Sequence, residues 1–203
     1  MKARIDAFPP SMNLSSNVFL AMVLLVPGFA AADEPFVSYS DKATGFGVHR
    51  PAGWEVSKEV VPAGTVTTFI NGKTSTSGCL IASYRVPLHG KDNALHILLE
   101  KAPMKGSAWE VILDAQGYKA VKIVSVTAGQ LAGHPANKLD FFGLSPLGDK
   151  KLFARAMMIA APIEKKLWKI DCFGIGNTRE LAEKSFEDAA SSIRQIQESF
   201  RSE

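Results

Sequence analysis

The chain has 203 residues, with 23 lysines and arginines against 20 aspartates and glutamates, and a formal net charge of +3. So small an excess of positive charge gives no support for a nucleic-acid partner, because binding to phosphates requires a strongly basic surface. Without residues 1–32 the chain is still long enough for one domain with a buried core, so we expect a single domain over residues 33–203.

An apolar run at residues 18–32 is the first feature along the chain. It follows a weakly basic start and ends on Ala30-Ala31-Ala32, which fits the A-x-A pattern that signal peptidase cleaves. This run of 15 residues is short for a membrane span, which needs about 20 residues. We therefore predict a signal peptide over residues 1–32, cleavage after Ala32, and a periplasmic or secreted protein. A retained anchor is the alternative.

Short runs rich in β-branched and aromatic residues predict five strands in the first half of the domain. They cover residues 36–39, 46–49, 54–60, 65–70 and 78–86. The pair Asn71-Gly72 directly follows the fourth of these strands. Because asparagine and glycine tolerate positive φ, the pair predicts a two-residue type I′ turn that joins the fourth and fifth strands in a hairpin.

The second half of the domain is expected to contain helices as well as strands. A helix is expected at residues 92–101, and a second helix begins with Ser107 and Glu110, which match a capping box, and ends at a left-handed Gly117. Apolar residues three and four positions apart then predict one long helix over residues 178–200. Four strands lie between the last two helices, at residues 120–127, 136–142, 151–161 and 165–173. Strands in hairpin order with inserted and appended helices indicate an α+β fold.

Cys79 and Cys172 are the two cysteines of the chain. In an oxidising compartment an isolated pair of this kind is usually a disulfide, so we predict a bridge between them. Two buried free thiols are the alternative. The chain has no C-x-x-C motif, which disfavours thiol-disulfide catalysis.

The sequence contains no recognisable catalytic or metal-binding motif. Gly72-Lys73-Thr74 resembles the end of a phosphate-binding loop, but the position that requires its first glycine is Thr67. The chain has no G-x-S-x-G elbow and no H-E-x-x-H pair. Its histidines have no cysteine or carboxylate at metal-ligand spacing; they are His49, His89, His96 and His134. We therefore predict no catalytic, cofactor-binding or metal-binding residues.

One glycine-rich connection remains as a candidate anion-binding site. Gly174 and Gly176 follow a predicted strand and open the last helix, with Arg179 behind them. Amide groups at a helix start together with an arginine can hold an anion. The third glycine of a dinucleotide-binding fingerprint is replaced by Arg179, so we do not expect a dinucleotide.

Several short segments resemble PsbP-like domains. Tyr39-Ser40-Asp41, Gly45-Phe46 and Pro51-Ala52-Gly53-Trp54 are similar to the opening of these domains, and Leu131-Ala132-Gly133-His134-Pro135-Ala136 is similar to the turn before a central strand. The resemblance implies an α/β/α sandwich on a central antiparallel sheet with a long C-terminal helix. It also implies an accessory or binding role, since the family includes the extrinsic photosystem II subunit and a Ran-binding nuclear-import factor.

Together these observations favour a non-enzymatic periplasmic domain that binds or supports an envelope protein, without a cofactor. A small-ligand or anion-binding protein is the alternative. A hydrolase-type enzyme that pairs a histidine with Asp140 or Asp171 is the second alternative.

Overall fold

A computed structural model describes residues 35–61, 64–85, 103–145 and 151–202. The predicted signal peptide at residues 1–32 and the predicted helix at residues 92–101 lie outside the described residues. Among the helices that the structure describes, none is both long enough and apolar enough to cross a membrane.

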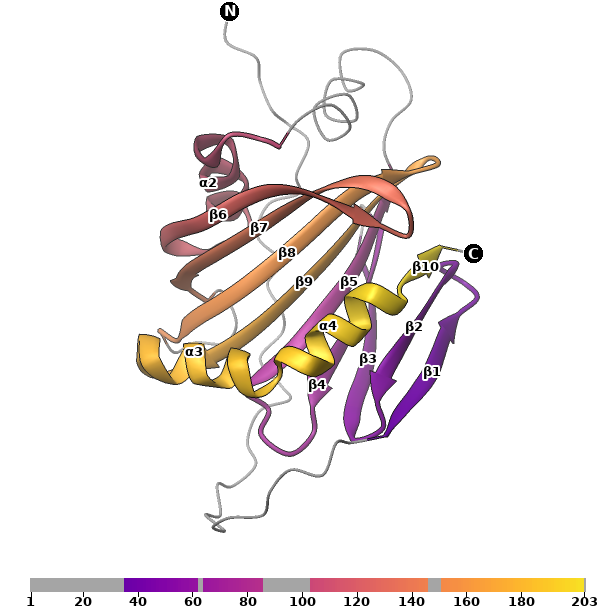
Figure 1. Cartoon of the computed structure of the whole chain (residues 1–203), viewed down its shortest axis with the longest axis horizontal. Coiled ribbons are helices and arrows are strands. Elements are labelled where there is room, and N and C mark those ends of the chain that lie inside the picture. Colours follow the sequence, from indigo (N-terminus) through magenta and orange to yellow (C-terminus); the bar gives the residue numbers. More distant parts are fainter. Residues whose placement is uncertain (1–34, 62–63, 86–102, 146–150, 203) are drawn as a thin grey trace, which may run out of the picture.

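Seven antiparallel strands form the main sheet, in the order β3-β4-β5-β9-β8-β7-β6 (Figure 1). The strands are β3 (Trp54–Val61), β4 (Gly64–Asn71), β5 (Ser77–Arg85), β6 (Lys119–Leu131), β7 (His134–Leu144), β8 (Phe153–Ile163) and β9 (Lys166–Gly176). Each of them overlaps a strand that the residue pattern predicts. Along the chain, β9 is the last strand of this sheet, and it lies beside β5. The two halves of the chain therefore join in the middle of the sheet.

A second sheet of three strands does not share a ladder with the first but packs against it in a shared hydrophobic core. It contains β1 (Phe36–Asp41), β2 (Phe46–Pro51) and the short β10 (Arg201–Ser202), with β2 in the centre. The expectation of one central sheet is therefore corrected, because the first two strands pair with each other and with the C-terminus. Lys166 at the start of β9 holds this sheet in place by donating a hydrogen bond to the Thr44 carbonyl oxygen at 2.6 Å.

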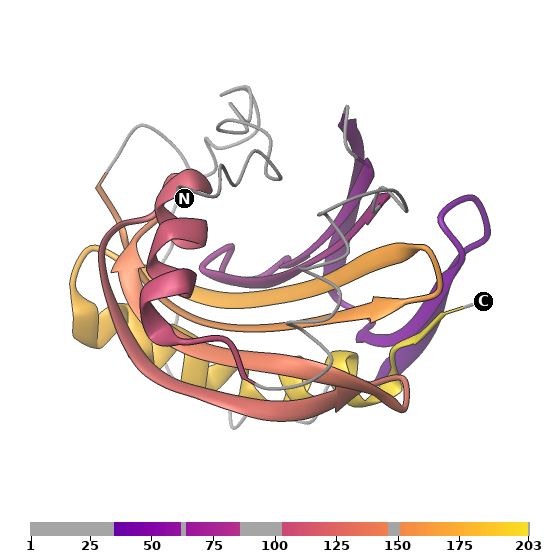
Figure 2. The ribbon, with the colours of Figure 1, turned by 90° about the horizontal axis from the view of Figure 1, so that it is seen from above.

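Helices cover both faces of the main sheet, which is strongly curved (Figure 2). The helix α2 (Gly106–Ala115) lies on the concave side, here called the inner face, while α3 (Arg179–Asp188) and α4 (Ala190–Ser199) lie along the outer face. The outer-face core includes Ile170, Ile193 and Ile196. The inner-face core includes Leu113 and Phe141. The α+β prediction is confirmed.

The predicted long C-terminal helix is two helices. They meet at Ala189, which has φ −98° and ψ 1° and donates a hydrogen bond from its N–H to the Phe186 carbonyl oxygen. The change of direction lets α3 lie on β8 and β9 while α4 lies on β2. Ala189 itself is 3% exposed, so the junction is packed into the core. Contacts with two different sheets favour the break over a straight helix.

Two local predictions about turns and caps are also corrected. The β4–β5 hairpin exists, but its loop spans residues 72–76 and has positive φ at Ser75 rather than at Asn71 and Gly72, so it is not a type I′ turn. The helix α2 begins at Gly106 with Lys105 as its N-cap, two residues too early for the capping box in which Ser107 was expected to be the N-cap. The Ala108 and Trp109 amide groups donate to the Lys105 carbonyl oxygen, and the N-cap residue makes no side-chain hydrogen bond. Gly117 does adopt the expected left-handed conformation, with φ 89°.

The predicted disulfide between Cys79 and Cys172 is present. The two residues lie directly opposite each other on β5 and β9, with Cα atoms 4.0 Å apart. Both are fully buried in the outer-face core. The bridge therefore closes a separation of 93 residues at the junction between the two halves of the sheet.

Candidate functional site

A polar cluster lies within the apolar inner face of the main sheet. Lys169 and Asp171 are two positions apart on β9 and so point to the same side. The ammonium nitrogen of Lys169 lies 3.7 Å from an Asp171 carboxylate oxygen and 3.3 Å from Oε1 of Gln116. Tyr118, which follows α2, interacts with the Asp171 carboxylate. The connection after α2 thus completes a cluster whose two charged members come from β9.

Burial determines the protonation behaviour of this cluster. Asp171 is 3% exposed, and burial raises the pKa of its carboxyl although Lys169 and Tyr118 oppose the shift. Burial also raises the pKa of Tyr118 well above its usual range, with a further contribution from the Asp171 carboxylate. Ionisable groups perturbed by burial and by a specific partner are concentrated at functional sites, although structural ion pairs show the same shifts.

Two buried atoms on the inner face have no hydrogen-bond partner within the described part of the chain. They are Oδ1 of Asp171 and the indole nitrogen of Trp109, and both side chains are 3% exposed. The first can accept a hydrogen bond and the second can donate one. Buried polar atoms are normally paired, so each of these two atoms is a candidate contact for a ligand atom. The described residues contain no group of three metal-ligating side chains.

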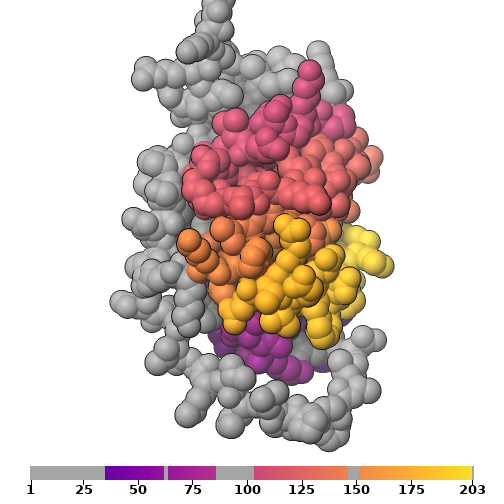
Figure 3. Space-filling view, turned by 90° about the vertical axis from the view of Figure 1, so that its left-hand side faces the viewer, coloured from indigo at the N-terminus to yellow at the C-terminus, as the bar shows by residue number. Residues whose placement is uncertain are grey.

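The outer face carries a second charged arrangement, at the end where α3 begins. The guanidinium of Arg155 lies between the rings of Phe142 and Phe186, 5.0 Å from each ring centre. It donates a hydrogen bond to Asp140 at 2.9 Å. Arg179 lies over the same Phe142 ring, at 5.2 Å. Figure 3 faces this end of the molecule, where α3 lies next to the start of β8. The stack attaches α3 to the sheet.

The structure gives Gly174 and Gly176 a packing role. A Cβ atom on Gly174 would lie 2.3 Å from the Phe186 nitrogen, and one on Gly176 would lie 2.7 Å from the Ala182 nitrogen. Both glycines therefore let α3 lie directly on β9. The anion site that these glycines and Arg179 suggested stays a prediction.

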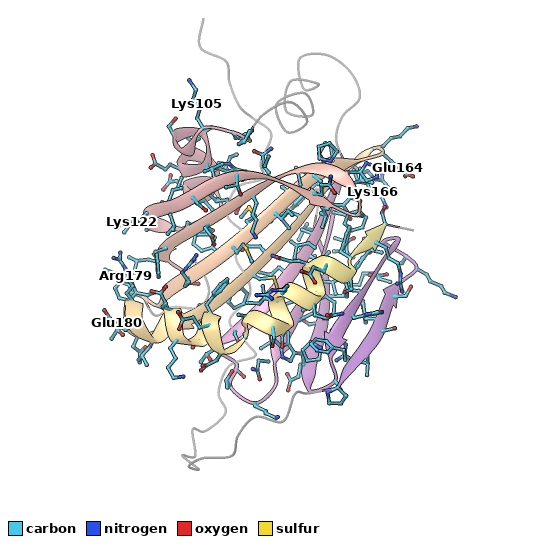
Figure 4. The ribbon with its side chains drawn as sticks, viewed as in Figure 1. Lys105, Lys122, Glu164, Lys166, Arg179 and Glu180 are labelled. Carbon is cyan, nitrogen blue, oxygen red and sulfur yellow. A yellow bond between two sulfur atoms is a disulfide. The ribbon has the colours of Figure 1, made fainter. Side chains whose placement is uncertain are left out.

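The start of α3 already has a negative charge of its own. Thr178 caps the helix by accepting a hydrogen bond from the Leu181 N–H at 3.2 Å. Glu180 lies in the first turn, where hydrogen bonds to its own backbone and to Thr178 lower the pKa of its carboxyl. Glu180 is exposed at the start of α3, next to Arg179, which lies over the Phe142 ring of β7 (Figure 4). An anion would have to compete with this carboxylate.

The described histidines lie away from the aspartates that were candidates for acid–base work. His49 lies on β2 and its backbone N–H bonds to Ser199 Oγ. His134 is exposed at the start of β7. Asp140 is bound to Arg155 instead, and Asp171 to Lys169. His89 and His96 lie outside the described residues.

Exposed apolar side chains are concentrated on the outermost strands at one side of the molecule. Phe36 and Val37 lie on β1, and Val56 and Val60 lie on β3. Val60 is 78% exposed. These four account for more than half of the large apolar side chains that are exposed in the described chain; the others are Val111, Val124 and Leu181. Figure 1 shows β1 and β3 on the same side of the molecule, away from α2.

Sequence reasoning missed the inner-face cluster. Alternation along residues 165–173 puts Lys169 and Asp171 on the face opposite Trp168 and Ile170, and by residue type alone that face is the polar one. That face is covered instead, because β9 lies in the middle of the sheet and the inner face carries its own apolar core. A strand pattern reports which residues share a face, but not whether that face meets water.

No known family model matches the chain, and no curated protein matches it in sequence. Two kinds of solved structure share its fold. The cyanobacterial PsbP (CyanoP) of Synechocystis sp. PCC 6803 aligns with a TM-score of 0.54 and 15% identity over 88% of this chain and 99% of its own. The Ran-binding protein Mog1p of Saccharomyces cerevisiae aligns with a TM-score of 0.51 and 8% identity over 84% of this chain and 96% of its own. The architecture of this chain is thus the PsbP-like fold.

Proposed function

We propose that this protein is a non-enzymatic domain of the cell envelope that binds a protein partner through the outer strands β1 and β3. The observation that carries the proposal is the exposure of Phe36, Val37, Val56 and Val60 on these strands. Exposed apolar surface is typical of protein-binding sites, and here more than half of the exposed large apolar side chains of the described residues lie on these two strands. The fold is consistent with such a role, because Mog1p, which has a similar fold, is a Ran-binding protein.

An extracytoplasmic location forms part of the proposal. Disulfides persist mainly in oxidising compartments, and the buried Cys79–Cys172 bridge suits such a compartment. The apolar segment at residues 18–32 supplies the export signal. Fractionation of cells that produce the tagged chain, with N-terminal sequencing of the product, should recover an envelope protein that begins at Asp33. A cytoplasmic product that retains residues 1–32 would overturn this part.

Site-specific photocrosslinking tests the binding surface. A photoreactive amino acid is placed at Val37 or Val60, and in matched controls at Val111 or Leu181, which are also exposed apolar positions but lie on α2 and α3. After irradiation of intact cells, we expect a discrete crosslinked species from Val37 or Val60 and none from the controls. Equal crosslinking from all four positions, or from none of them, would contradict the proposal.

Small-ligand binding is a second candidate, favoured by the unpartnered buried atoms Oδ1 of Asp171 and Nε1 of Trp109. A ligand on the inner face should raise the melting temperature of the protein, since ligands that bind only the folded state stabilise it. A thermal-shift screen of small amino and amide compounds should then find hits that Asp171→Asn abolishes. Hits that persist in that variant would exclude this site.

A further inference from the structure

The β3 strand has the regular geometry of a strand that can accept a neighbour. All eight of its residues pair in continuous register with β4, from Trp54 opposite Asn71 to Val61 opposite Gly64. No strand within residues 35–61, 64–85, 103–145 and 151–202 pairs with its other edge. Residues 55–60 are all exposed. Figure 2 shows β3 and the β1–β2 hairpin diverging, so the small sheet does not continue this edge.

The backbone groups that face this free edge can be identified. In an antiparallel pair, alternate residues direct their N–H and C=O groups toward the neighbouring strand. Gly53 directs its carbonyl toward the β4 side, where it accepts from the Gly72 N–H at 3.3 Å. The Trp54 carbonyl points the other way and is bound by Arg50 Nη1 at 2.7 Å. The same alternation turns the backbone groups of Val56, Lys58 and Val60 toward the free edge.

The two edges of the main sheet differ in how they discourage pairing. Natural edge strands are commonly protected by bulges or by charged side chains. At the opposite edge, the β6 ladder has register shifts between Lys119 and Lys122 and between Ile123 and Ser125. The β3 ladder has none. Its lysine, Lys58, is held by Asp41 at 2.6 Å and so is less free to repel an incoming strand.

Side chains on β3 define the chemistry of the segment that would fit. Glu55, Ser57 and Glu59 lie on the inner face, opposite Ile70, Thr68 and Val66 of β4. Val56 and Val60 lie on the outer side. Side chains of adjacent strands meet directly on each face, where opposite charges and apolar pairs are favourable. The complementary segment therefore alternates basic residues, facing Glu55 and Glu59, with apolar residues, facing Val56 and Val60.

We propose that β3 is the docking edge of this protein, and that its occupant is an extended partner segment of alternating basic and apolar residues that adds to the sheet as a strand. Main-chain hydrogen bonds to Val56, Lys58 and Val60 would provide affinity, and the alternating side chains would provide specificity. This inference rests on the proposed function, since it names the mode of binding and the chemistry of the partner.

Titration with a peptide tests the mode of binding directly. The probe is an acetylated eight-residue peptide of alternating lysine and valine, added to the isotope-labelled protein while amide NMR shifts are followed. We expect shift changes concentrated in residues 54–61. A second peptide, N-methylated at its valines, keeps every charge but loses the N–H donors that would face Val56, Lys58 and Val60, and should bind at least tenfold more weakly. No binding, or equal binding of both peptides, would overturn the inference.

Variants of the protein distinguish the contribution of side-chain charge to peptide binding from that of main-chain hydrogen bonds. Glu55→Lys with Glu59→Lys should weaken binding at least tenfold, while the matched reversal Glu187→Lys with Glu198→Lys, at exposed positions of α3 and α4, should leave it unchanged. Val60→Pro removes one outward N–H without removing a ladder bond, so it should keep the fold and weaken the complex. Unchanged binding in both β3 variants, with normal thermal unfolding, contradicts the docking edge.

The crosslinking experiment distinguishes failure of this inference from failure of the proposed function. If Val37 crosslinks a partner and that crosslink persists in both β3 variants, the protein-binding function stands and strand addition at β3 falls. If no position crosslinks a partner, the proposed function itself falls. Loss of the captured species in both β3 variants, with the α3 and α4 control unaffected, supports both.

Discussion

Asp41 and Asp171 are both buried and both lie on strands, but their surroundings act in opposite directions. Burial tends to raise the pKa of each carboxyl. At Asp41 the hydrogen bonds and charge of Lys58, together with hydrogen bonds from Thr44, outweigh burial and lower the pKa. At Asp171 Lys169 and Tyr118 do not outweigh burial, and the pKa stays raised. Relative to the unfolded chain, folding thus favours the ionised form of Asp41 and the protonated form of Asp171.

Asp171→Asn and Asp41→Asn should therefore change the pH dependence of stability with opposite signs. The folded protein retains the Asp171 proton at a higher pH than the unfolded chain does. The free energy of unfolding of the wild type relative to Asp171→Asn should thus fall as pH rises from about 4 through the raised pKa, by at most about 1.4 kcal/mol per pH unit. The free energy of unfolding of the wild type relative to Asp41→Asn should instead fall as the pH decreases through the lowered pKa of Asp41. Urea unfolding across this range measures both, and slopes of the same sign would contradict the assignment.

At the scale of elements, the position of α3 depends on two residues without side chains. Gly174 and Gly176 on β9 let the backbone of α3 lie against the strand. The guanidinium of Arg155 on β8 also lies over the Phe186 ring of α3. The residue pattern predicted helical structure over this region, because the spacing of apolar residues along the chain encodes it. The close approach to β9 depends on atoms that are remote in sequence, so no local pattern could predict it.

Gly174→Ala should accordingly destabilise the protein. The added Cβ would lie 2.3 Å from the Phe186 nitrogen and 2.6 Å from the Ala182 carbonyl oxygen, so α3 would have to move away from β9. Forced overpacking of this kind typically costs about 1–3 kcal/mol in the free energy of unfolding. The matched control is Gly129→Ala on β6, whose Cβ would meet its nearest neighbours at 3.8 Å. Chemical denaturation should show the loss in the first variant only; equal effects would exclude the packing explanation.

At the scale of the whole molecule, the disulfide joins two strands that are 93 residues apart along the chain but adjacent in the sheet. The β3–β4–β5 block comes from the first half of the domain, and β9 belongs to the block formed by the second half. Cys79 and Cys172 connect these blocks where they meet, inside the outer-face core. In the chain-entropy view, a bridge across 93 residues mainly restricts the unfolded chain.

Replacement of both cysteines, by Cys79→Ala with Cys172→Ala, should lower the free energy of unfolding by about 2–5 kcal/mol. The denaturant dependence should also become steeper, because the unfolded chain without the bridge can expand and expose more surface. Urea unfolding of the wild type and the double variant measures both quantities. An unchanged slope with unchanged stability would show that the bridge contributes nothing beyond the packing around it.

The sequence by itself determined the positions of the nine longer strands that the structure describes, the pairing of the two cysteines and the α+β class. Each depends on information that is local or compositional: alternation, turn residues, or an isolated cysteine pair. Only the tertiary structure decided that β9 lies beside β5, that the last helix breaks at Ala189 and that Asp171 is buried. These features depend on which distant surfaces meet, and burial against a remote element can override any preference encoded in neighbouring residues.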